Sequence, residues 1–381
     1  MLLATAAADP GRRALIAGNA ELSYGKLAAR ALAFAEALVA AGARPGDRVA
    51  ILLRRDADAA AAFYGTLATG AIAVLVSDQL RPRQIEHVLE HSGATLLLAA
   101  QDVVKRLPRE LRTTASWLDP GQIPAAADFR PVDRVESDVA HIIYTSGSTG
   151  LPKGVTLSHG NVGAGVRAVV SYLGLGAEDR IASLLPFNFD YGLNQLLCSV
   201  ATGATLVVER SPVPARIVRT LAAREVTVLP CVPPLWLQLL ATESFADPLP
   251  ALRLMTNTGG RLPLHAVRGL RERHPKAQLV LMYGLTEASR STYLPPERVD
   301  AKPDSIGRAI PEAEVLVIGD DGVECAPGEV GELVHRGPTV ALGYWNDAEA
   351  TARRYRPHPL RPEGSPETER VVYSGDLVRR D

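Results

Sequence analysis

The stretch from residue 144 to residue 154 reads Tyr-Thr-Ser-Gly-Ser-Thr-Gly-Leu-Pro-Lys-Gly and follows the apolar, strand-like segment 139–143. It combines Ser and Thr hydroxyls with three glycines and one lysine. Glycines let backbone N–H groups point into a loop, hydroxyls bond at close range, and a lysine adds a mobile positive charge. Lysine supplies only five of the 41 basic residues, which makes its position here informative. We expect a strand leading into a loop that suits the polyphosphate of a nucleotide.

This loop does not match the mononucleotide P-loop, in which GxxxxGK is followed by Ser or Thr. Counted from Gly147, the sixth position is Pro152, and Gly154 follows Lys153. The sequence therefore gives little support to a kinase-type P-loop. Taken alone, the stretch is also compatible with a flexible polar loop that binds nothing.

The size and charge of the chain narrow the class of protein. Its 381 residues are too many for one simple core, so we expect two or three packed subdomains. The net charge of −1 provides no global field for nucleic acid or an anionic membrane. Three widely spaced cysteines without zinc-site spacing are typical of reduced thiols in a cytoplasmic protein. Residues 59–76 are uncharged, and we interpret them as a buried helix ending near Gly70 and then a strand, rather than a membrane span.

Helical and strand patterns alternate through most of the chain, which predicts parallel sheets covered by helices. Strand candidates lie at 226–229, 252–255 and 278–282, and helices centred near 165, 197, 219, 238 and 269 separate them. After about residue 300, short apolar runs alternate with Gly, Pro and Asp turns, as in a small antiparallel barrel. An Arg-rich stretch near 352–361 reads as a solvated surface.

We therefore predict an α/β fold of two doubly wound, mostly parallel sheet subdomains plus a small β-barrel subdomain. The expected boundaries are 1–140 for the first α/β subdomain, 141–305 for the second, which carries the phosphate loop and an acyl pocket, and 306–381 for the barrel.

Three further segments follow the loop in order. Residues 283–287 read Tyr-Gly-Leu-Thr-Glu, residues 331–344 contain Gly-Glu-Leu, Arg-Gly and Gly-Tyr, and residues 373–376 read Tyr-Ser-Gly-Asp. Together with the loop, their order and spacing resemble those of the AMP-forming adenylating enzymes. That superfamily contains acyl-CoA synthetases, the adenylation domains of peptide synthetases, and firefly luciferase. The resemblance covers nearly the whole chain.

The resemblance implies that the protein couples a carboxylic acid to ATP, releases pyrophosphate, and passes the acyl group to a thiol of CoA or of a carrier protein. Joining AMP to a carboxylate turns a poor leaving oxygen into a stabilised leaving group. That step needs charge neutralisation and in-line positioning rather than a protein nucleophile. Alternatives are a free-standing amino-acid adenylation domain and a non-catalytic module that binds a nucleotide or an acyl group. A luciferase-like oxygenase shares these motifs, but nothing in the sequence specifically supports that activity.

The resemblance also assigns an ATP site by position in the matching motifs. Its residues are Thr145, Ser146, Gly147, Ser148, Thr149, Gly150, Lys153, Gly259, Gly260, Tyr283, Gly284, Thr286 and Asp376. The loop 145–150 and Lys153 would hold the β- and γ-phosphates, and Glu287 would bind Mg²⁺, a hard ion that prefers carboxylate oxygen. Lys153, Thr286 and Glu287 are the predicted catalytic residues.

The remaining contacts of the nucleotide follow from the same motifs. Thr286 would contact the α-phosphate, Tyr283 would pack on the adenine, and Asp376 would accept hydrogen bonds from the ribose hydroxyls. Gly259 and Gly260 would let the backbone approach the base and the acyl pocket. Each motif taken alone is more often a turn, a helix start or a loop, and only their joint order favours the functional interpretation.

The substrate segment is more ambiguous. Its candidate residues are Phe189, Asp190, Asn194, Thr258, Gly259 and Arg290. Phe189-Asp190 is similar to peptide-synthetase adenylation domains, where an aspartate pairs with the α-ammonium of an amino acid, but Asp190 could equally cap the helix that follows. Arg290 could meet a polar or acidic group of the substrate, or make a structural ion pair.

Members of the superfamily continue past the last motif through a hinge into a C-terminal lid domain that supplies a lysine for adenylation. The sequence ends at Asp381, so no residue here takes that role. We expect this chain to bind ATP and the acid but to adenylate weakly on its own.

Overall fold

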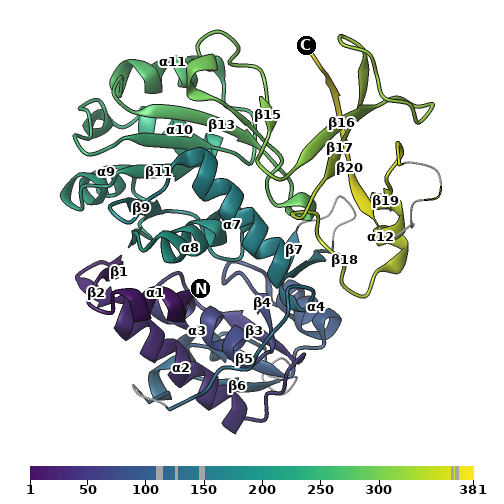
Figure 1. The fold of residues 1–381 in the computed structure, drawn as a ribbon. Coiled ribbons are helices and arrows are strands. Elements are labelled where there is room, and N and C mark those ends of the chain that lie inside the picture. Colours follow the sequence, from purple (N-terminus) through teal and green to yellow (C-terminus); the bar gives the residue numbers. More distant parts are fainter. Residues whose placement is uncertain (109–114, 125–127, 146–150, 362–363, 365–368) are drawn as a thin grey trace.

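The structure is a computed structural model that describes residues 1–108, 115–124, 128–145, 151–361, 364 and 369–381. Two large, mostly parallel sheets and one smaller antiparallel sheet build the molecule (Figure 1). The α/β class with two parallel-rich sheets is confirmed. Among the helices of the described ranges, none combines the length and apolar character that crossing a bilayer requires.

The first sheet has the strand order β18-β8-β7-β4-β3-β5-β6. Its members are β3 (Arg48–Leu52), β4 (Ile72–Leu75), β5 (Leu96–Ala99), β6 (Ser116–Leu118), β7 (Val139–Thr145), β8 (Lys153–Ser158) and β18 (Gly343–Tyr344). Five strands are parallel, and β8 and β18 add an antiparallel edge. The phosphate-loop motif therefore lies in the β7–β8 hairpin.

The second sheet has the order β15-β14-β13-β12-β11-β9-β10-β1-β2. Its members are β1 (Arg13–Ala17), β2 (Ala20–Ser23), β9 (Arg180–Ser183), β10 (Thr205–Val208), β11 (Val228–Cys231), β12 (Leu254–Asn257), β13 (Gln278–Tyr283), β14 (Thr292–Leu294) and β15 (Arg308–Ala309). The strands from β1 to β13 in this order are parallel. Because β1 and β2 come from the start of the chain, the two sheets interleave along the sequence, and the division at residues 140 and 305 stays a prediction.

The helices form layers on both sides of these sheets. They are α1 (Leu2–Ala8), α2 (Tyr24–Ala40), α3 (Ala57–Ala68), α4 (Pro82–Ser92), α5 (Gln101–Val104), α7 (His159–Leu173), α8 (Asp190–Thr202), α9 (Pro214–Ala223), α10 (Pro233–Leu240), α11 (Leu264–Arg273) and α12 (Ala348–Arg354). Short 3₁₀ turns occur at Pro120–Gln122, Glu243–Phe245, Thr286–Ala288 and Pro296–Arg298. The helices expected near 165, 197, 219, 238 and 269 correspond to α7 through α11.

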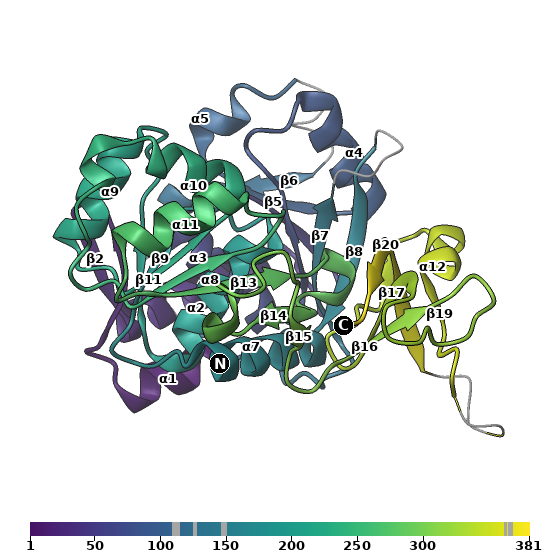
Figure 2. The ribbon, with the colours of Figure 1, turned by 90° about the horizontal axis from the view of Figure 1, so that it is seen from above.

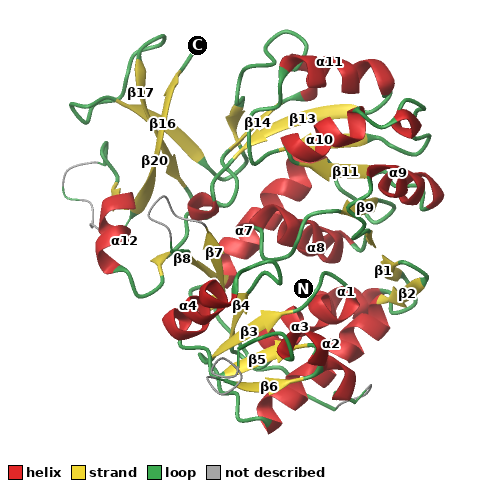
Figure 3. Cartoon of the chain, turned by 180° about the vertical axis from the view of Figure 1, so that it is seen from behind, coloured by secondary structure: helices red, strands yellow, loops and turns green. Residues whose placement is uncertain are grey.

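The largest apolar core lies between the two large sheets, where α2, α3, α7 and α8 pack (Figure 3). Local sequence explains where two of these helices begin. The Ser23 side chain accepts a hydrogen bond from the Lys26 N–H at the start of α2, and Ser158 and Asn161 form a capping box at α7. The helix and strand expected within residues 59–76 are α3 and β4. Helices α9, α10 and α11 cover the outer face of the second sheet, where a separate apolar cluster forms.

The C-terminal part is an open sheet rather than the expected barrel. Its strands are β16 (Glu314–Ile318), β17 (Val330–Arg336), β19 (Tyr355–Pro357) and β20 (Arg370–Arg379), in the order β16-β17-β20-β19. In the described residues, the edge strands β16 and β19 do not pair with each other, so the sheet does not close. It lies beside the β7–β8 hairpin (Figure 2), and β18 joins the first sheet through β8.

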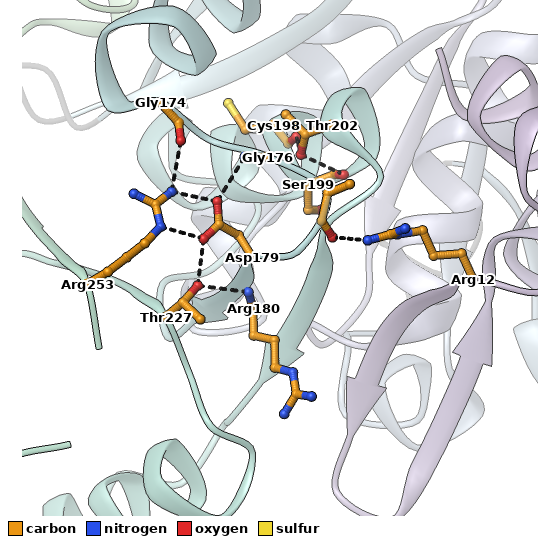
Figure 4. Close-up of polar contacts among 11 residues, drawn as sticks. Arg12, Gly174, Gly176, Asp179, Arg180, Cys198, Ser199, Thr202, Thr227 and Arg253 are labelled. Atoms are coloured by element: carbon orange, nitrogen blue, oxygen red, sulfur yellow. Dashed lines mark hydrogen bonds and ion pairs between the residues drawn. The ribbon is translucent and has the colours of Figure 1, made fainter. Parts of the chain in front are cut away.

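Polar groups at the amino ends of the second sheet form a cluster centred on Asp179 (Figure 4). Arg253, which precedes β12, donates from Nε and Nη2 to the two carboxylate oxygens at 2.7 and 2.6 Å. The Gly176 N–H and the Thr227 hydroxyl add hydrogen bonds at 2.9 and 2.7 Å. These contacts tie together the starts of β9, β11 and β12.

Candidate active site

The predicted site residues gather at the opposite, carboxyl ends of the same parallel strands. The segment 186–190 follows β9, Thr258 to Gly260 follow β12, and Gly284 to Glu287 follow β13. In open α/β sheets, ligands bind outside the carboxyl ends of the strands. The topology thus brings residues that are about a hundred positions apart to one edge of the sheet.

The β7–β8 hairpin supplies Lys153, one of the basic residues of the site. Thr145 and Lys153 are opposite each other in the ladder, and both line a cavity of about 500 Å³ together with Glu287. A Cβ on Gly154 would lie 3.1 Å from the Tyr144 ring and 2.8 Å from Ile142, so only glycine fits this close approach. The loop residues Ser146, Gly147, Ser148, Thr149 and Gly150 lie outside the described residues, and their phosphate contacts stay a prediction.

Tyr344 of β18 connects the lysine and the carboxylate. Its hydroxyl donates to Glu287 Oε1 at 2.6 Å, and Lys153 Nζ lies 5.3 Å from the centre of its ring. Burial and the hydrogen bond to Glu287 raise the pKa of Tyr344, so the phenol stays a donor at neutral pH. Glu287 is thereby held with its carboxylate at the cavity that Lys153 also lines.

Glu287 could hold a magnesium ion. No group of three or more His, Cys, Asp or Glu side chains within the described residues is placed to form a metal cage. A Mg²⁺ ion that is bound through one or two carboxylates and the phosphates of a substrate needs no such cage. Glu287, a half-buried carboxylate in the cavity that Lys153 also lines, fits that type of site, and Glu332 lines the same cavity.

A second cavity, of about 420 Å³, lies on the other side of the β13 end. Thr258, Gly259, Gly260, Tyr283 and Gly284 line it. Gly259 has φ of +76°, and a Cβ there would meet Phe189 and Val232 at 3.5 and 3.2 Å. Tyr283, which is predicted to pack on the adenine, and Gly259, which lies beside Phe189 of the predicted acyl pocket, therefore line the same cavity.

Tyr283 also contacts the C-terminal sheet. Its hydroxyl donates to Asp376 Oδ2 of β20 at 2.5 Å, and its ring stacks on His335 of β17 with centroids 5.9 Å apart. Burial, and to a lesser extent Arg354, lowers the pKa of His335 to about 4, so this imidazole is neutral near pH 7. The contact places the predicted adenine and ribose residues side by side, although they are far apart in sequence.

The predicted acid-binding residues lie around the first turn of α8. Asp190 is the first residue of α8, after the N-cap Phe189, and its Oδ1 accepts a hydrogen bond from the Tyr191 N–H at 2.7 Å. Arg290 Nη1 lies 3.5 Å from Asp190 Oδ2. Burial raises the pKa of Asp190, and the Arg290 guanidinium offsets only part of that rise. The structure thus brings Asp190 and Arg290 together.

Thr286 and Asn194 connect this region to the phosphate side. Asp190, Asn194, Thr286 and Ser289 line one small cavity of about 20 Å³. Thr286 opens the 3₁₀ turn that carries Glu287 into the larger cavity. The predicted contact of the α-phosphate therefore lies between the residue predicted to bind a metal and the residues predicted to bind the acid.

Three arginines at the cavity of Lys153 and Glu287 were not predicted as site residues from the sequence. Arg353, Arg354 and Arg356 line the same cavity as Lys153 and Glu287, although the stretch 352–361 reads as a solvated surface. The nearby Gly343-Tyr344 motif was the signal that could have placed them, because β18 pairs with β8 and directly precedes α12.

Comparison with known proteins fits this geometry. The AMP-binding enzyme family matches residues 2–345, so the chain belongs to the AMP-binding enzymes. It is 31% identical to tyrocidine synthase 3 of Brevibacillus parabrevis over 97% of the chain, which spans 6% of that protein. It is also 31% identical to novobiocin biosynthesis protein H of Streptomyces niveus over 99% of the chain, which spans 63% of that protein.

Solved structures agree with this family. The crystal structure of VinN superposes with a TM-score of 0.88 at 28% identity, covering 99% of this chain and 94% of VinN. A complex of VinN with L-aspartate superposes with a TM-score of 0.84 at the same identity and coverage.

Proposed function

We propose that the chain activates a carboxylic acid as its acyl-adenylate, using ATP and releasing pyrophosphate, for transfer to a thiol of CoA or of a carrier protein. The observation that carries this proposal is the shared cavity of Thr145, Lys153 and Glu287 beside the acid residues of α8. This arrangement supports a site for charged phosphates next to a separate site for the acid.

In this reaction a carboxylate oxygen of the acid attacks the α-phosphorus of ATP. The bond to the β-phosphate oxygen breaks, and pyrophosphate leaves with the electron pair. Lys153 would neutralise charge on the leaving phosphates, and Thr286 would position the α-phosphate. A magnesium ion on Glu287 would supply further positive charge at the phosphates when bound. Tyr283 and Asp376 would orient the adenosine.

The acyl group is then transferred from the acyl-adenylate to a thiol. A thiolate attacks the carbonyl carbon of the acyl-adenylate, the bond between that carbon and the bridging oxygen breaks, and AMP leaves with the oxygen and its electron pair. All three cysteines of the chain are described, buried and unpaired, so the thiol is proposed to come from a partner. Buried free thiols also support a reducing, cytoplasmic location.

Amino-acid adenylation is the second candidate. Asp190 would pair with an α-ammonium group, as in the adenylation domains that the motif resembles. The similarity to tyrocidine synthase 3 and the complex of VinN with L-aspartate support this version. A non-catalytic binding module remains the contrasting alternative.

ATP–pyrophosphate exchange across acids with and without α-amino groups tests the proposal, with calorimetric titration of Mg·ATP as a second readout. Acid-dependent exchange, even at a low rate, would support activation. Undetectable Mg·ATP binding together with exchange that no acid stimulates would refute it.

A further inference from the structure

Arg290 is a buried cation with unused hydrogen-bond donors. Its side chain is 3% exposed, and Nη1 contacts Asp190 at 3.5 Å and the Ser289 carbonyl at 3.0 Å. The other two nitrogens, Nε and Nη2, have no hydrogen-bond partner among the described residues. A buried guanidinium with unmade hydrogen bonds is energetically unfavourable, so a group that meets these donors is expected.

The orientation of Arg290 is fixed from two sides. Its guanidinium carbon lies 4.7 Å from the centre of the Tyr191 ring, and the Tyr191 hydroxyl is bonded to Thr256. Behind it, a Cβ on Gly284 would lie only 3.1 Å from the Arg290 Cα, so the glycine of the motif at 283–287 lets this segment pack closely. The free edge is therefore held in place rather than mobile.

Nε and Nη2 form one edge of the guanidinium. Two parallel N–H groups on that edge match the two oxygens of a carboxylate, and they offer no acceptor to an ammonium group. Gln195, which is also buried, lines the same cavity, and its amide has no partner in the described part of the chain. An amide N–H there could add a third donor to the same anion.

The residues around Arg290 do not supply a second anion. Burial raises the pKa of Cys198 to about 12, despite the opposing effect of Arg290, so this thiol is neutral. Asp190 is the one carboxylate among the described residues that pairs with Arg290, and it does so through Nη1 alone. The site is thus built to accept one more negative charge.

The available space limits the size of that anion. The cavity beside Arg290 measures about 20 Å³, so a group that enters it must be compact. Asn194 lines both this cavity and the one that contains Thr286 and Asp190, so the two cavities are adjacent. This spacing suits a short acid and leaves no room for a long acyl chain.

We infer that Arg290 binds a second carboxylate of the substrate, so that the chain selects short dicarboxylic acids over monocarboxylic ones. One carboxylate would react near Thr286, and the other would lie on the Nε–Nη2 edge of Arg290. This inference rests on the proposed adenylation and names the substrate class of the same site.

Stable acyl-adenylate mimics test the inference separately from the proposed function. Adenosine 5′-sulfamates carrying a succinyl group, its terminal amide or a butyryl group share one nucleotide half and differ only at the far end of the acid. Displacement of bound ATP gives the affinity of each. We expect all three to displace ATP and the succinyl compound to bind about 10- to 100-fold more tightly than the other two, as for hydrogen bonds to a charged group.

Variants assign the effect to the guanidinium. Arg290→Met should remove the preference for the succinyl compound while ATP affinity stays, and Arg290→Lys should keep only part of it because lysine lacks the fork. Arg308→Met is the matched control, since Arg308 also lies against a tyrosine ring, 5.3 Å from the centre of Tyr293, but is exposed. It should keep the full preference.

Equal affinity of the wild-type chain for the succinyl compound and its amide would overturn the inference and leave the proposed function intact. That comparison needs no variant to fold. Loss of ATP affinity in Arg290→Met would likewise overturn it, because Arg290 would then be a nucleotide contact. If none of the mimics displaced ATP, the proposed function would fail and the inference with it.

Discussion

Two arginine–aspartate pairs at opposite ends of the second sheet differ in how completely their hydrogen bonds are made. Arg253 and Asp179, at the amino ends, form a two-pronged pair, and the carboxylate accepts further hydrogen bonds from Gly176 and Thr227 (Figure 4). Arg290 and Asp190, at the carboxyl ends, touch through one nitrogen at 3.5 Å. The first pair is complete without a ligand, and the second leaves donors for one. The contrast separates residues that stabilise the fold from residues that we propose to bind substrate.

The largest expected effect is on stability at the amino ends. Arg253→Met should lower the free energy of unfolding by about 2–3 kcal/mol, because it leaves a buried carboxylate without its partner. Arg290→Met should change it by about 1 kcal/mol or less, since it removes a guanidinium whose hydrogen bonds are mostly unmade. Denaturant titration measures both, with the exposed Arg106→Met as the control. A larger loss of unfolding free energy for Arg290→Met would mean that the Arg290–Asp190 pair stabilises the fold.

The pH dependence of stability should differ in sign between the two aspartates. Burial raises the pKa of Asp179, but the hydrogen bonds from Arg253, Gly176 and Thr227 outweigh it, and the pKa lies below the ordinary value. Its stabilisation is then present above the unfolded pKa of about 3.9 and is lost as the pH falls through the lower folded pKa. For Asp190, whose pKa is raised, the contribution of the carboxyl group to folding stability is present below about pH 3.9. It is lost as the pH rises through the higher folded pKa.

Asp179→Asn should therefore destabilise the chain near neutral pH and have less effect at about pH 3. Asp190→Asn should be neutral or stabilising near neutral pH, and this gain should shrink on acidification. Unfolding curves recorded across this range would show the two trends. If the stability of both variants changed with pH in the same direction, the two arginine–aspartate pairs would not differ in the way described above.

At the carboxyl ends, the effect should fall on ligand binding instead of stability. Glu287→Gln should weaken Mg·ATP binding by about tenfold and leave the unfolding free energy nearly unchanged, because glutamine keeps the size but loses the charge that a hard cation needs. Calorimetric titration at fixed Mg²⁺ measures this. Unchanged affinity would remove the metal role of Glu287.

The smallest effect on ligand binding is expected from a substitution at Tyr283. Tyr283→Phe removes the hydrogen bond to the exposed Asp376 and should cost about 0.5–1 kcal/mol of ATP affinity, while the ring that would face the adenine remains. The same titration applies, with Tyr293→Phe as the control, because the Tyr293 hydroxyl accepts a hydrogen bond from the exposed Arg308. A loss as large as that of Glu287→Gln would show that the phenol, and not the ring, binds the nucleotide.

The sequence predicted three strands of the second sheet and the helices around them, because their signals are local. Apolar runs bounded by glycine and proline mark β11, β12 and β13, and the helices between them have clear amphipathic patterns. The pairing of β1 with β10, nearly two hundred residues away, could not be predicted from such patterns. The open C-terminal sheet was also missed, because whether edge strands meet depends on long-range pairing rather than on turns.

The same limit applies to the site. Motif order identified Lys153, Tyr283, Glu287 and Asp376 as candidates, and the fold brings the first and third into one cavity. The pairing of Asp190 with Arg290 was beyond prediction, because a contact across one hundred residues depends on how β9 and β13 are ordered in the sheet. The roles of these residues stay predictions.

The most direct test of the account compares a succinyl adenosine 5′-sulfamate with adenosine 5′-sulfamate that lacks an acyl group, by displacement of ATP from the wild-type chain. A site that binds the acyl-adenylate across both halves predicts that the succinyl compound binds at least about tenfold more tightly. Equal affinity of the two compounds would mean that the carboxyl ends of the second sheet bind a nucleotide alone, and would contradict acid activation at this site.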